Sequence, residues 1–299
     1  MTDASAGGGV NPTLRGGLPI LTVLLAIVAI WYGAAIWMNA PWVRDQAARA
    51  ETTLTTADLI RQTLTLERPV LPAPHQVAAG LWDGIAGQKI TSKRSLVWHG
   101  WVTLSATLAG FAIGTVAGIA LAVGIVHNRA MDQSVMPWAV ASQTVPILAI
   151  APMVIVVFAS MGVTGLLPKA IIAAWLSFFP VLVGMVKGLR TPDGMQLDLM
   201  HSWNASRAQQ FWRLRLPSSL PYLFASLKVA IAAALVGTIV GELPAGATAG
   251  LGARLLSGSY YGQTVQIWSA LFAAAILAAV LVMLIGALER LTLRRMGLA

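Results

Sequence analysis

The sequence has no cysteine and few charged residues: Asp, Glu, Lys and Arg together make up 10% of its 299 residues. Without cysteine, the chain can form no disulfide, no thiolate metal site and no cysteine nucleophile. A soluble domain is typically about 25% charged, whereas 57% of this chain is hydrophobic. The protein is therefore expected to fold in a bilayer, where a helix satisfies its own backbone hydrogen bonds.

Signatures of catalysis are also missing. The sequence contains no GxxxxGK(S/T) phosphate-binding loop, so the chain is not expected to bind nucleotide itself. No Ser/His/Asp set shares a predicted face, and the histidines, which lack metal-ligand spacing, are expected at the surface. They are His75, His99, His127 and His201. The sequence thus predicts no catalytic residue, no metal site and no cofactor of its own.

Long apolar segments dominate what is present. A helix needs roughly 20 mostly apolar residues to cross a bilayer, and six segments qualify: 18–38, 101–126, 134–160, 166–188, 218–241 and 265–288. The first is read as an uncleaved anchor, because its apolar run exceeds the roughly 7 to 15 residues of a signal-peptide core. The predicted fold is an all-α polytopic membrane protein with six transmembrane helices.

The distribution of positive charge predicts the orientation. The net charge of +9 comes from 20 Lys and Arg against 11 Asp and Glu, and basic residues in short loops favour the cytoplasmic side. With both termini in the cytoplasm of a bacterial inner membrane, only Lys169 and Arg254 flank short outer loops. The inner positions are Arg15, Arg129, Lys187, Arg190, Arg207, Arg213, Arg215, Arg290, Arg294 and Arg295. Because topology explains the charge, nucleic-acid binding is not expected.

These spans divide the chain into regions. The divisions are an N-terminal tail (1–17), the first span (18–38), an extracytoplasmic loop (39–100), a core (101–289) and a C-terminal tail (290–299). In the outer loop, residues 43–68 mix charged and apolar residues as a solvated helix would, and prolines then force extended backbone before a second short helix near 75–87. This loop is either a structural cap or a contact for an external partner.

Polar residues interrupt the apolar pattern between the fourth and fifth spans. Thr191 and Pro192 fit the N-cap and first turn of a short helix, on which Leu197, Met200 and Trp203 would form one apolar stripe. The helix is expected to run from 192 to 203.

A turn should follow this helix. Asparagine tolerates the left-handed conformation that closes a helix, so Asn204 is expected to join it to a second helix over 205–214. Pro217 and Pro221 would end that helix and begin the fifth span. The pair of helices is expected either to bind a protein partner or to lie on lipid as an interfacial amphipathic segment.

The spacing within this stretch resembles a known family. Asp198-Leu199-Met200, then Asn204, then Leu216-Pro217 is similar to the cytoplasmic loop of binding-protein-dependent ABC importer permeases, which reads Glu-Ala-Ala, three residues, Gly, and Leu-Pro twelve residues later. Asp replaces Glu, Leu-Met replaces Ala-Ala and Asn replaces Gly. The resemblance implies that the following residues couple the chain to an ATPase: Asp198, Leu199, Met200, Asn204, Ala205, Leu216 and Pro217.

Four further segments (71–85, 103–125, 145–162 and 240–255) resemble the branch of this family that serves nitrate, sulfonate, taurine and pyrimidine precursors. Together they cover roughly residues 70–295. The resemblance implies a non-enzymatic permease subunit for a small anionic or heterocyclic solute. Its expected partners are an external solute-binding protein, a second permease copy or paralogue, and an ATPase subunit that binds the ATP.

Two other functions also require several membrane spans. A secondary transporter driven by an ion gradient would usually show an internal repeat and paired intramembrane charges. A membrane enzyme would need a convergent acid, base or metal cluster in its spans. Neither pattern is evident in the sequence.

Polar residues within the spans are candidates for the solute pathway. Glu242 lines the pathway or gate, caps backbone, or pairs with Arg254. The other candidates are Gln143, Thr144 and Pro146, which lie on a third span interrupted by prolines, where carbonyls freed by proline must face protein or a water-lined cavity. Lys228 is expected to extend its amine to the inner headgroups.

Overall fold

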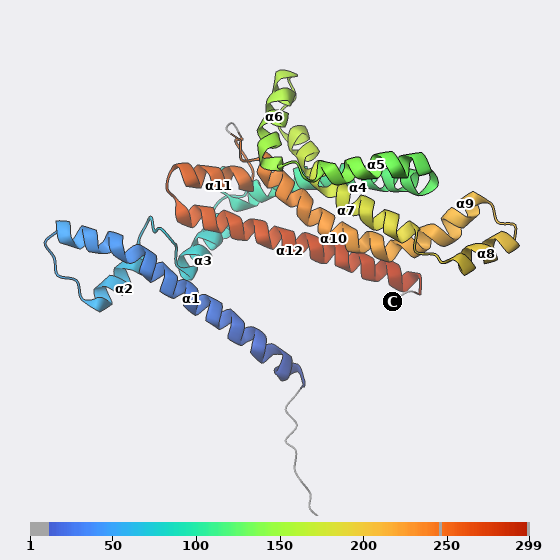
Figure 1. Ribbon diagram of the computed structural model, residues 1–299. Coiled ribbons are helices and arrows are strands. Elements are labelled where there is room, and N and C mark those ends of the chain that lie inside the picture. Colours follow the sequence, from blue (N-terminus) through green and yellow to red (C-terminus); the bar gives the residue numbers. More distant parts are fainter. Residues whose placement is uncertain (1–11, 245–246, 298–299) are drawn as a thin grey trace, which may run out of the picture.

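The computed structural model describes residues 12–244 and 247–297, with side chains from Pro19 onward. Parts of both predicted tails, residues 1–11 and 298–299, lie outside the described residues. Long helices run side by side and form an elongated bundle, and α1 (Pro12–Arg49) extends away from it (Figure 1). The helices of the bundle are α4 (Leu96–His127), α7 (Leu166–Leu189), α10 (Leu216–Gly241) and α12 (Thr264–Arg295).

Within the described residues, these five helices are long and apolar enough to cross a membrane. The predicted third span is different, because it consists of α5 (Arg129–Ser142) and α6 (Ile147–Ser160), which meet at 96°. The number of spans is six if this bent pair counts as one. The break lies at residues 143–146, with Pro146 at the start of α6, whereas Pro137 and Pro152 lie inside their helices.

Glycines allow α4 and α7 to pack closely. A Cβ at Gly114 would lie 2.1 Å from the Ser177 hydroxyl oxygen and 2.9 Å from the Ala174 carbonyl oxygen. Gly110 and Gly118, one turn to either side, approach the same helix. Small residues at this four-residue spacing bring helix backbones together where lipid provides no hydrophobic drive between helices. The glycine stripe therefore fixes the α4–α7 contact at the centre of the bundle.

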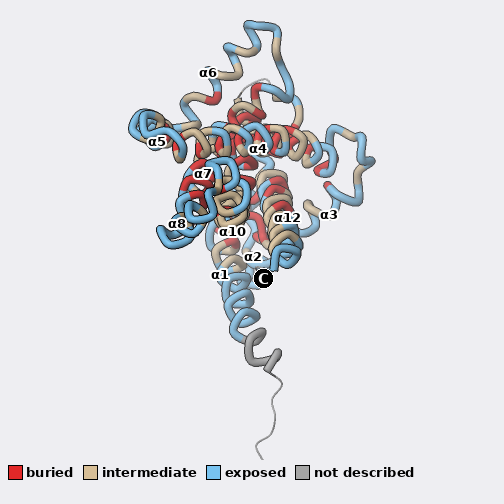
Figure 2. Tube along the Cα trace, turned by 90° about the vertical axis from the view of Figure 1, so that its right-hand side faces the viewer, coloured by how far each residue is buried: buried red, intermediate tan, exposed pale blue. Residues whose placement is uncertain are grey.

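Glycines also allow α7 and α10 to pack closely. Gly184 faces Ser226, Gly188 faces Ser219, and Gly237 of α10 faces the backbone of Ala173. Figure 2 shows the buried residues gathered where the central helices meet, while α6 and most of α1 are exposed. In the most apolar 18-residue stretch of α1 only 6% is buried, whereas 39% is buried in that of α7. Most of the apolar surface of α1 is therefore exposed.

The region after the first span departs from prediction. Residues 43–49 belong to α1, and the following helix, α2, is limited to Thr56–Thr65, because the Thr55 side chain caps its start by accepting from Asp58 N–H. The predicted second short helix is confirmed as α3 (Pro74–Trp82), which continues as a π-helical turn over Asp83–Gly87. Buried Asn39 holds the segment to α1 through the backbone of residues 70 and 71, at 2.8–2.9 Å.

Candidate functional site

The short helix in the loop after α7 begins later than the sequence suggests. Thr191 is not an N-cap, since its hydroxyl donates to the Lys187 carbonyl at the end of α7. Asp193 caps the next helix, α8 (Gly194–Ser202), by accepting from Gln196 N–H at 2.8 Å. The Gln196 side chain accepts from Asp193 N–H in return, at 3.3 Å. This reciprocal capping box satisfies two free donors, which a Thr-Pro start could not do.

The predicted left-handed turn is confirmed. Asn204 has a φ of 54°. Its N–H donates to the His201 carbonyl at 2.8 Å, and the next N–H, of Ala205, donates to the Met200 carbonyl at 3.0 Å. These two bonds form a Schellman motif, which closes a helix where one residue turns left-handed.

The sequence suggested that a proline would end the second helix, but the structure shows otherwise. After α9 (Arg207–Gln210) the chain passes through a π-helical turn, Phe211–Arg215, directly into α10. Pro217 lies in the first turn of α10, where a missing N–H costs nothing, and Pro221 lies inside it. Arg215 donates to the Leu189 carbonyl at 3.0 Å and so ties this turn to the end of α7.

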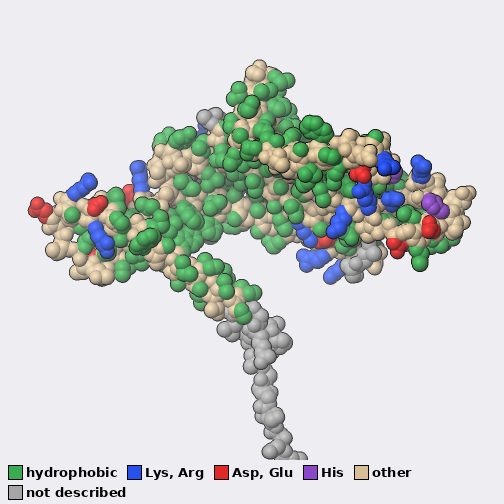
Figure 3. Space-filling view, viewed as in Figure 1, with side chains coloured by type: hydrophobic (Ala, Val, Ile, Leu, Met, Phe, Trp, Pro, Cys, Tyr) green, Lys and Arg blue, Asp and Glu red, His purple; other side chains and the backbone are tan. Residues whose placement is uncertain are grey.

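Helix α8 is only loosely packed against the described residues, among which Leu197 and Met200 of the predicted apolar stripe are half-buried. None of its residues is buried, and Asp198 is exposed. Met195 is 81% exposed, Leu199 50% and Trp203 69%, and the four-residue spacing places these side chains on one face. We call Met195, Leu199 and Trp203 the α8 stripe. It lies at the end of the bundle opposite α11 (Figure 1), where Figure 3 shows many Lys and Arg side chains.

At the other end, Glu242 follows α10 and is fully buried. The Thr103 hydroxyl lies 2.9 Å from Oε2 and Gly252 N–H donates to Oε2 at 2.9 Å, while the Lys169 amine lies 3.5 Å from Oε1. Lys169 also donates to the Ala249 carbonyl at 3.0 Å, and Thr103 accepts from Leu251 N–H. We call these residues, with His99, the Glu242 cluster. It joins α4, α7 and α10 to α11 (Leu251–Tyr260).

The structure corrects the prediction for His99 and selects among the alternatives for Glu242. His99 is not at the surface: it is 3% exposed, its Nδ1 accepts from Gly250 N–H at 2.9 Å, and its Nε2 lies 2.9 Å from the Lys93 carbonyl. Glu242 accepts from backbone, as one alternative predicted, but its ion-pair partner is Lys169 rather than Arg254. Burial lowers the pKa of Arg254, and the positive charge of Arg94 lowers that pKa further.

Glycine makes the cluster possible. Gly250 has a φ of 123°, and a Cβ there would lie 2.1 Å from Oε1 of Glu242. Such backbone is almost confined to glycine. Spacing alone did not reveal the partners of Glu242, although the glycines at 250 and 252 were a sign that backbone comes close to another group.

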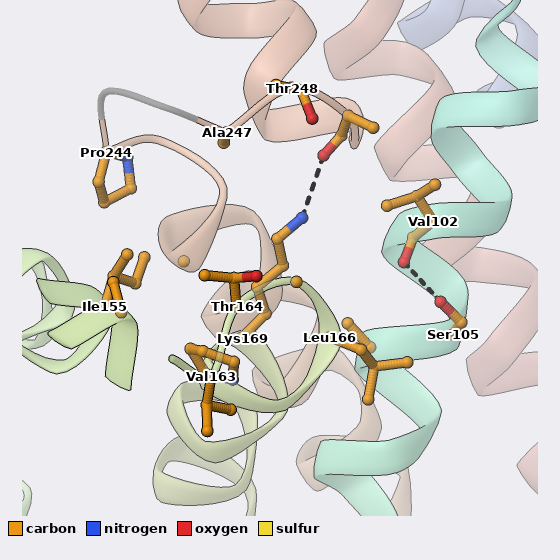
Figure 4. Close-up of a pocket in the computed structure, with 16 residues that line it drawn as sticks. Val102, Ser105, Ile155, Val163, Thr164, Leu166, Lys169, Pro244, Ala247 and Thr248 are labelled. Carbon is orange, nitrogen blue, oxygen red and sulfur yellow. Dashed lines mark hydrogen bonds between the residues drawn. The ribbon is translucent and has the colours of Figure 1, made fainter. Parts of the chain in front are cut away.

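A cavity of about 510 Å³ opens beside the cluster. Its walls come from α4, α6, α7 and the segment after α10, and Figure 4 shows Lys169 extending toward that segment. The labelled lining residues are Val102, Ser105, Ile155, Val163, Thr164, Leu166, Lys169, Pro244, Ala247 and Thr248.

The predicted pathway residues lie apart. Glu242 sits behind Lys169 and does not line the cavity, and neither do Gln143, Thr144 and Pro146 at the α5–α6 break. Gln143 is half-buried, and the other two are exposed. Lys228 pairs with Glu289 of α12, so it does not extend alone to the headgroups as predicted.

Comparison with known proteins assigns the chain to a family. Residues 114–298 match the model of the family described as the binding-protein-dependent transport system inner membrane component. The chain is 32% identical over 226 residues to the riboflavin transport system permease protein RibX of Chloroflexus aurantiacus, covering 75% of this chain and 80% of that protein.

Two other relatives agree. The formylaminopyrimidine transport permease protein ThiX of Halalkalibacterium halodurans is 32% identical over 183 residues, 61% of this chain and 68% of that protein. The taurine transport system permease protein TauC of Escherichia coli is 28% identical over 233 residues, 76% and 81% of the two chains. Nothing in these comparisons supports a secondary transporter. The chain belongs to the binding-protein-dependent inner membrane permease family and is a non-enzymatic, multi-pass component of an ABC importer, whose ATPase and solute-binding protein are separate subunits.

Proposed function

We propose that this permease conducts a small solute through the cavity beside Lys169 and that α8 docks in an ATPase subunit. The observation that carries the proposal is the α8 stripe: three large, exposed apolar side chains stand on a capped helix none of whose residues is buried within the described part of the chain. Exposed apolar surface of this kind marks an interaction site. The charged surroundings of α8 favour a protein groove over the lipid interior.

The coupling role follows from how α8 is attached. The capping box and the Schellman motif close α8 at its two ends, and from α9 the chain runs without a break into α10. A displacement of α8 would therefore be carried into the bundle. In this proposal Asp198, Leu199 and Met200 contact the ATPase, and Asn204 and Ala205 shape the turn.

Leu216 and Pro217 complete the proposed coupling segment, because they begin the helix that receives the displacement. The chain would bind no ATP itself. Nucleotide closure in the ATPase would reach the bundle through this segment alone.

The proposed contact between α8 and the ATPase also sets the orientation of the chain in the membrane. If α8 contacts the ATPase, it lies in the cytoplasm, in agreement with the excess of Lys and Arg in the short loops of that side. Both termini are then cytoplasmic and α2 is outside. Tags after Thr2 and Ala299 should resist labelling in sealed cells, and a tag after Thr53 should be labelled; the reverse pattern would refute this orientation.

A second permease chain, a copy or a paralogue, is also proposed. The cavity beside Lys169 is only partly enclosed by the single chain, and a second chain would complete a path through the bilayer. The residues at the α5–α6 break, Gln143, Thr144 and Pro146, remain pathway candidates on such an interface. Glu242 would act by holding Lys169 in the cavity wall.

The names of the relatives support a small organic solute. RibX and ThiX are named for riboflavin and formylaminopyrimidine, and TauC for taurine. We propose a heterocyclic or anionic solute delivered by the external binding protein.

Co-purification with the ATPase subunit tests the coupling site. Leu199→Ala should lower recovery of the ATPase by about tenfold, the equivalent of 1.4 kcal/mol, because the side chain would lose its groove. Asp198→Ala should also lower recovery, and Asp198→Glu should keep it. Leu148→Ala is the matched control, since Leu148 is 64% exposed on α6, away from α8. Equal recovery from all variants would reject the proposal.

A further inference from the structure

The cavity beside Lys169 carries a charge balance that points to a class of solute. We infer that it accepts an uncharged, hydrogen-bonding heterocycle and disfavours anions. The inference rests on the proposed role of the cavity as the solute pathway.

The cavity has no net charge of its own. Among the described residues that line it, Lys169 is the only ionisable one. Its amine is already held by the Glu242 carboxylate at 3.5 Å and by the Ala249 carbonyl at 3.0 Å, and its side chain is only 13% exposed. The Glu242 carboxylate, which lies behind the cavity wall, thus neutralises the positive charge of Lys169 in the absence of solute.

Glu242 cannot withdraw to make room for an anion. Donors from three directions, the Thr103 hydroxyl, Gly252 N–H and Lys169, fix both carboxylate oxygens, and the side chain is fully buried. An anion placed against Lys169 would therefore stand beside a fixed carboxylate and be repelled by it. Like-charge juxtaposition of this kind is a device for rejecting the wrong partner.

The rest of the lining suits an organic ring. Its walls include the apolar side chains of Val102, Ile155, Val163 and Leu166. The Ser105 hydroxyl donates to the Val102 carbonyl at 2.8 Å, which leaves its oxygen free to accept from a solute N–H. A volume of about 510 Å³ falls within the range of sites for small organic ligands, roughly 300–1,000 Å³. Nitrate or a short sulfonate would fill little of it.

Direct binding to the permease–ATPase complex in lipid nanodiscs, without the binding protein, tests this inference. Riboflavin and cytosine serve as uncharged probes, and methanesulfonate and nitrate as anions. The wild type should bind at least one uncharged probe about tenfold more tightly than either anion. Preference for an anion, or binding of neither uncharged probe, would overturn the inference.

Charge variants sharpen the test. Glu242→Gln leaves the Lys169 charge unpaired and should raise affinity for methanesulfonate about tenfold. Glu289→Gln, which removes the carboxylate from the Lys228 pair elsewhere, should leave every probe unchanged. If Glu242→Gln does not fold, Ser105→Lys adds an unpaired cation without touching the cluster and should have the same effect. Unchanged anion affinity in the folded variant would reject the charge argument.

A blocking variant separates this inference from the proposed function. Val163→Trp should narrow the cavity and weaken binding of every probe about tenfold. If every probe binds Val163→Trp as tightly as it binds the wild type, the cavity is not the pathway and the proposed function fails with it. If binding is weakened but the wild type prefers anions, the pathway stands and only the uncharged class is rejected.

Discussion

The two ends of the bundle differ in how their polar and apolar side chains are packed. At the α11 end, the buried groups of the Glu242 cluster meet partners from helices far apart in the sequence. At the α8 end, a helix carries three large exposed apolar side chains, and none of its residues is buried among those that the structure describes. The polar groups of one end are satisfied within the chain, whereas the other end leaves apolar side chains exposed.

The difference separates stability from interaction. A buried carboxylate is tolerated only when donors surround it, so residues of the Glu242 cluster should matter first for folding. Residues on α8 should matter little for folding and strongly for association. The following substitutions test this separation, in order of their expected effect on the stability of the permease itself.

The largest effect is expected from Thr103→Val, which keeps the shape of the side chain but removes its hydroxyl. Glu242 would lose a donor, and Leu251 N–H would lose its acceptor. Leaving buried groups unsatisfied should cost roughly 2–4 kcal/mol of unfolding free energy, measured by thermal unfolding in detergent. Thr144→Val, at an exposed position, is the control and should change little. Equal stability of the two variants would contradict the role given to the cluster.

A smaller loss is expected from Gly250→Ala. The new Cβ would collide with the Glu242 carboxylate at 2.1 Å, in backbone that suits only glycine. The strain should cost about 1–3 kcal/mol, and the same unfolding measurement detects it. Gly262→Ala is a useful comparison, because Gly262 also has a positive φ, of 64°, but nothing lies within 4 Å of its added Cβ. The difference between the two variants measures the collision together with the greater backbone strain at a φ of 123°.

At the α8 end, Asn204→Val should destabilise the turn by roughly 1–2 kcal/mol, since a β-branched residue strongly disfavours the left-handed conformation. The loss should be local. Hydrogen exchange should quicken over 198–206 while α4 and α7 keep their protection. Asn204→Gly should be neutral or slightly protective. Global unfolding by Asn204→Val would show that the two ends are coupled in stability.

The smallest effect on stability is expected from Met195→Ala, which should change the unfolding free energy by less than about 0.5 kcal/mol, as is usual for exposed positions. Its recovery of the ATPase subunit should nevertheless fall several-fold, because the same side chain would be buried in the complex. A stable variant with full ATPase binding would remove Met195 from the docking surface and leave Leu199 and Trp203 as its core.

Several elements could be predicted from the sequence because their causes are local. The apolar segments, the turn at Asn204 and the family spacing from Asp198 to Pro217 all depend on residues within a few positions of one another. The start of α8 was misplaced by two residues, because Asp193 with Gln196 makes a better cap than Thr191 with Pro192. The π-helical turn at 211–215 has no simple sequence signal.

The charged pairs could not be predicted in this way. The sequence offered Arg254 as one possible partner of Glu242. The observed partner, Lys169, lies on α7, and the closest hydroxyl belongs to Thr103, 139 positions away on α4. The pairing of Lys228 with Glu289 likewise joins two helices.

The sequence by itself determined the membrane environment, the number of apolar segments, the family and the turn after α8. Hydropathy, capping and backbone preference act over a few residues, so each can be read locally. Only the tertiary structure decided that the third span bends by 96°, that His99 is buried and that Glu242 neutralises Lys169 behind the cavity. Those outcomes depend on glycine contacts that set how closely α4, α7 and α10 approach, because the side chains that meet across helices are chosen by packing rather than by their order in the chain.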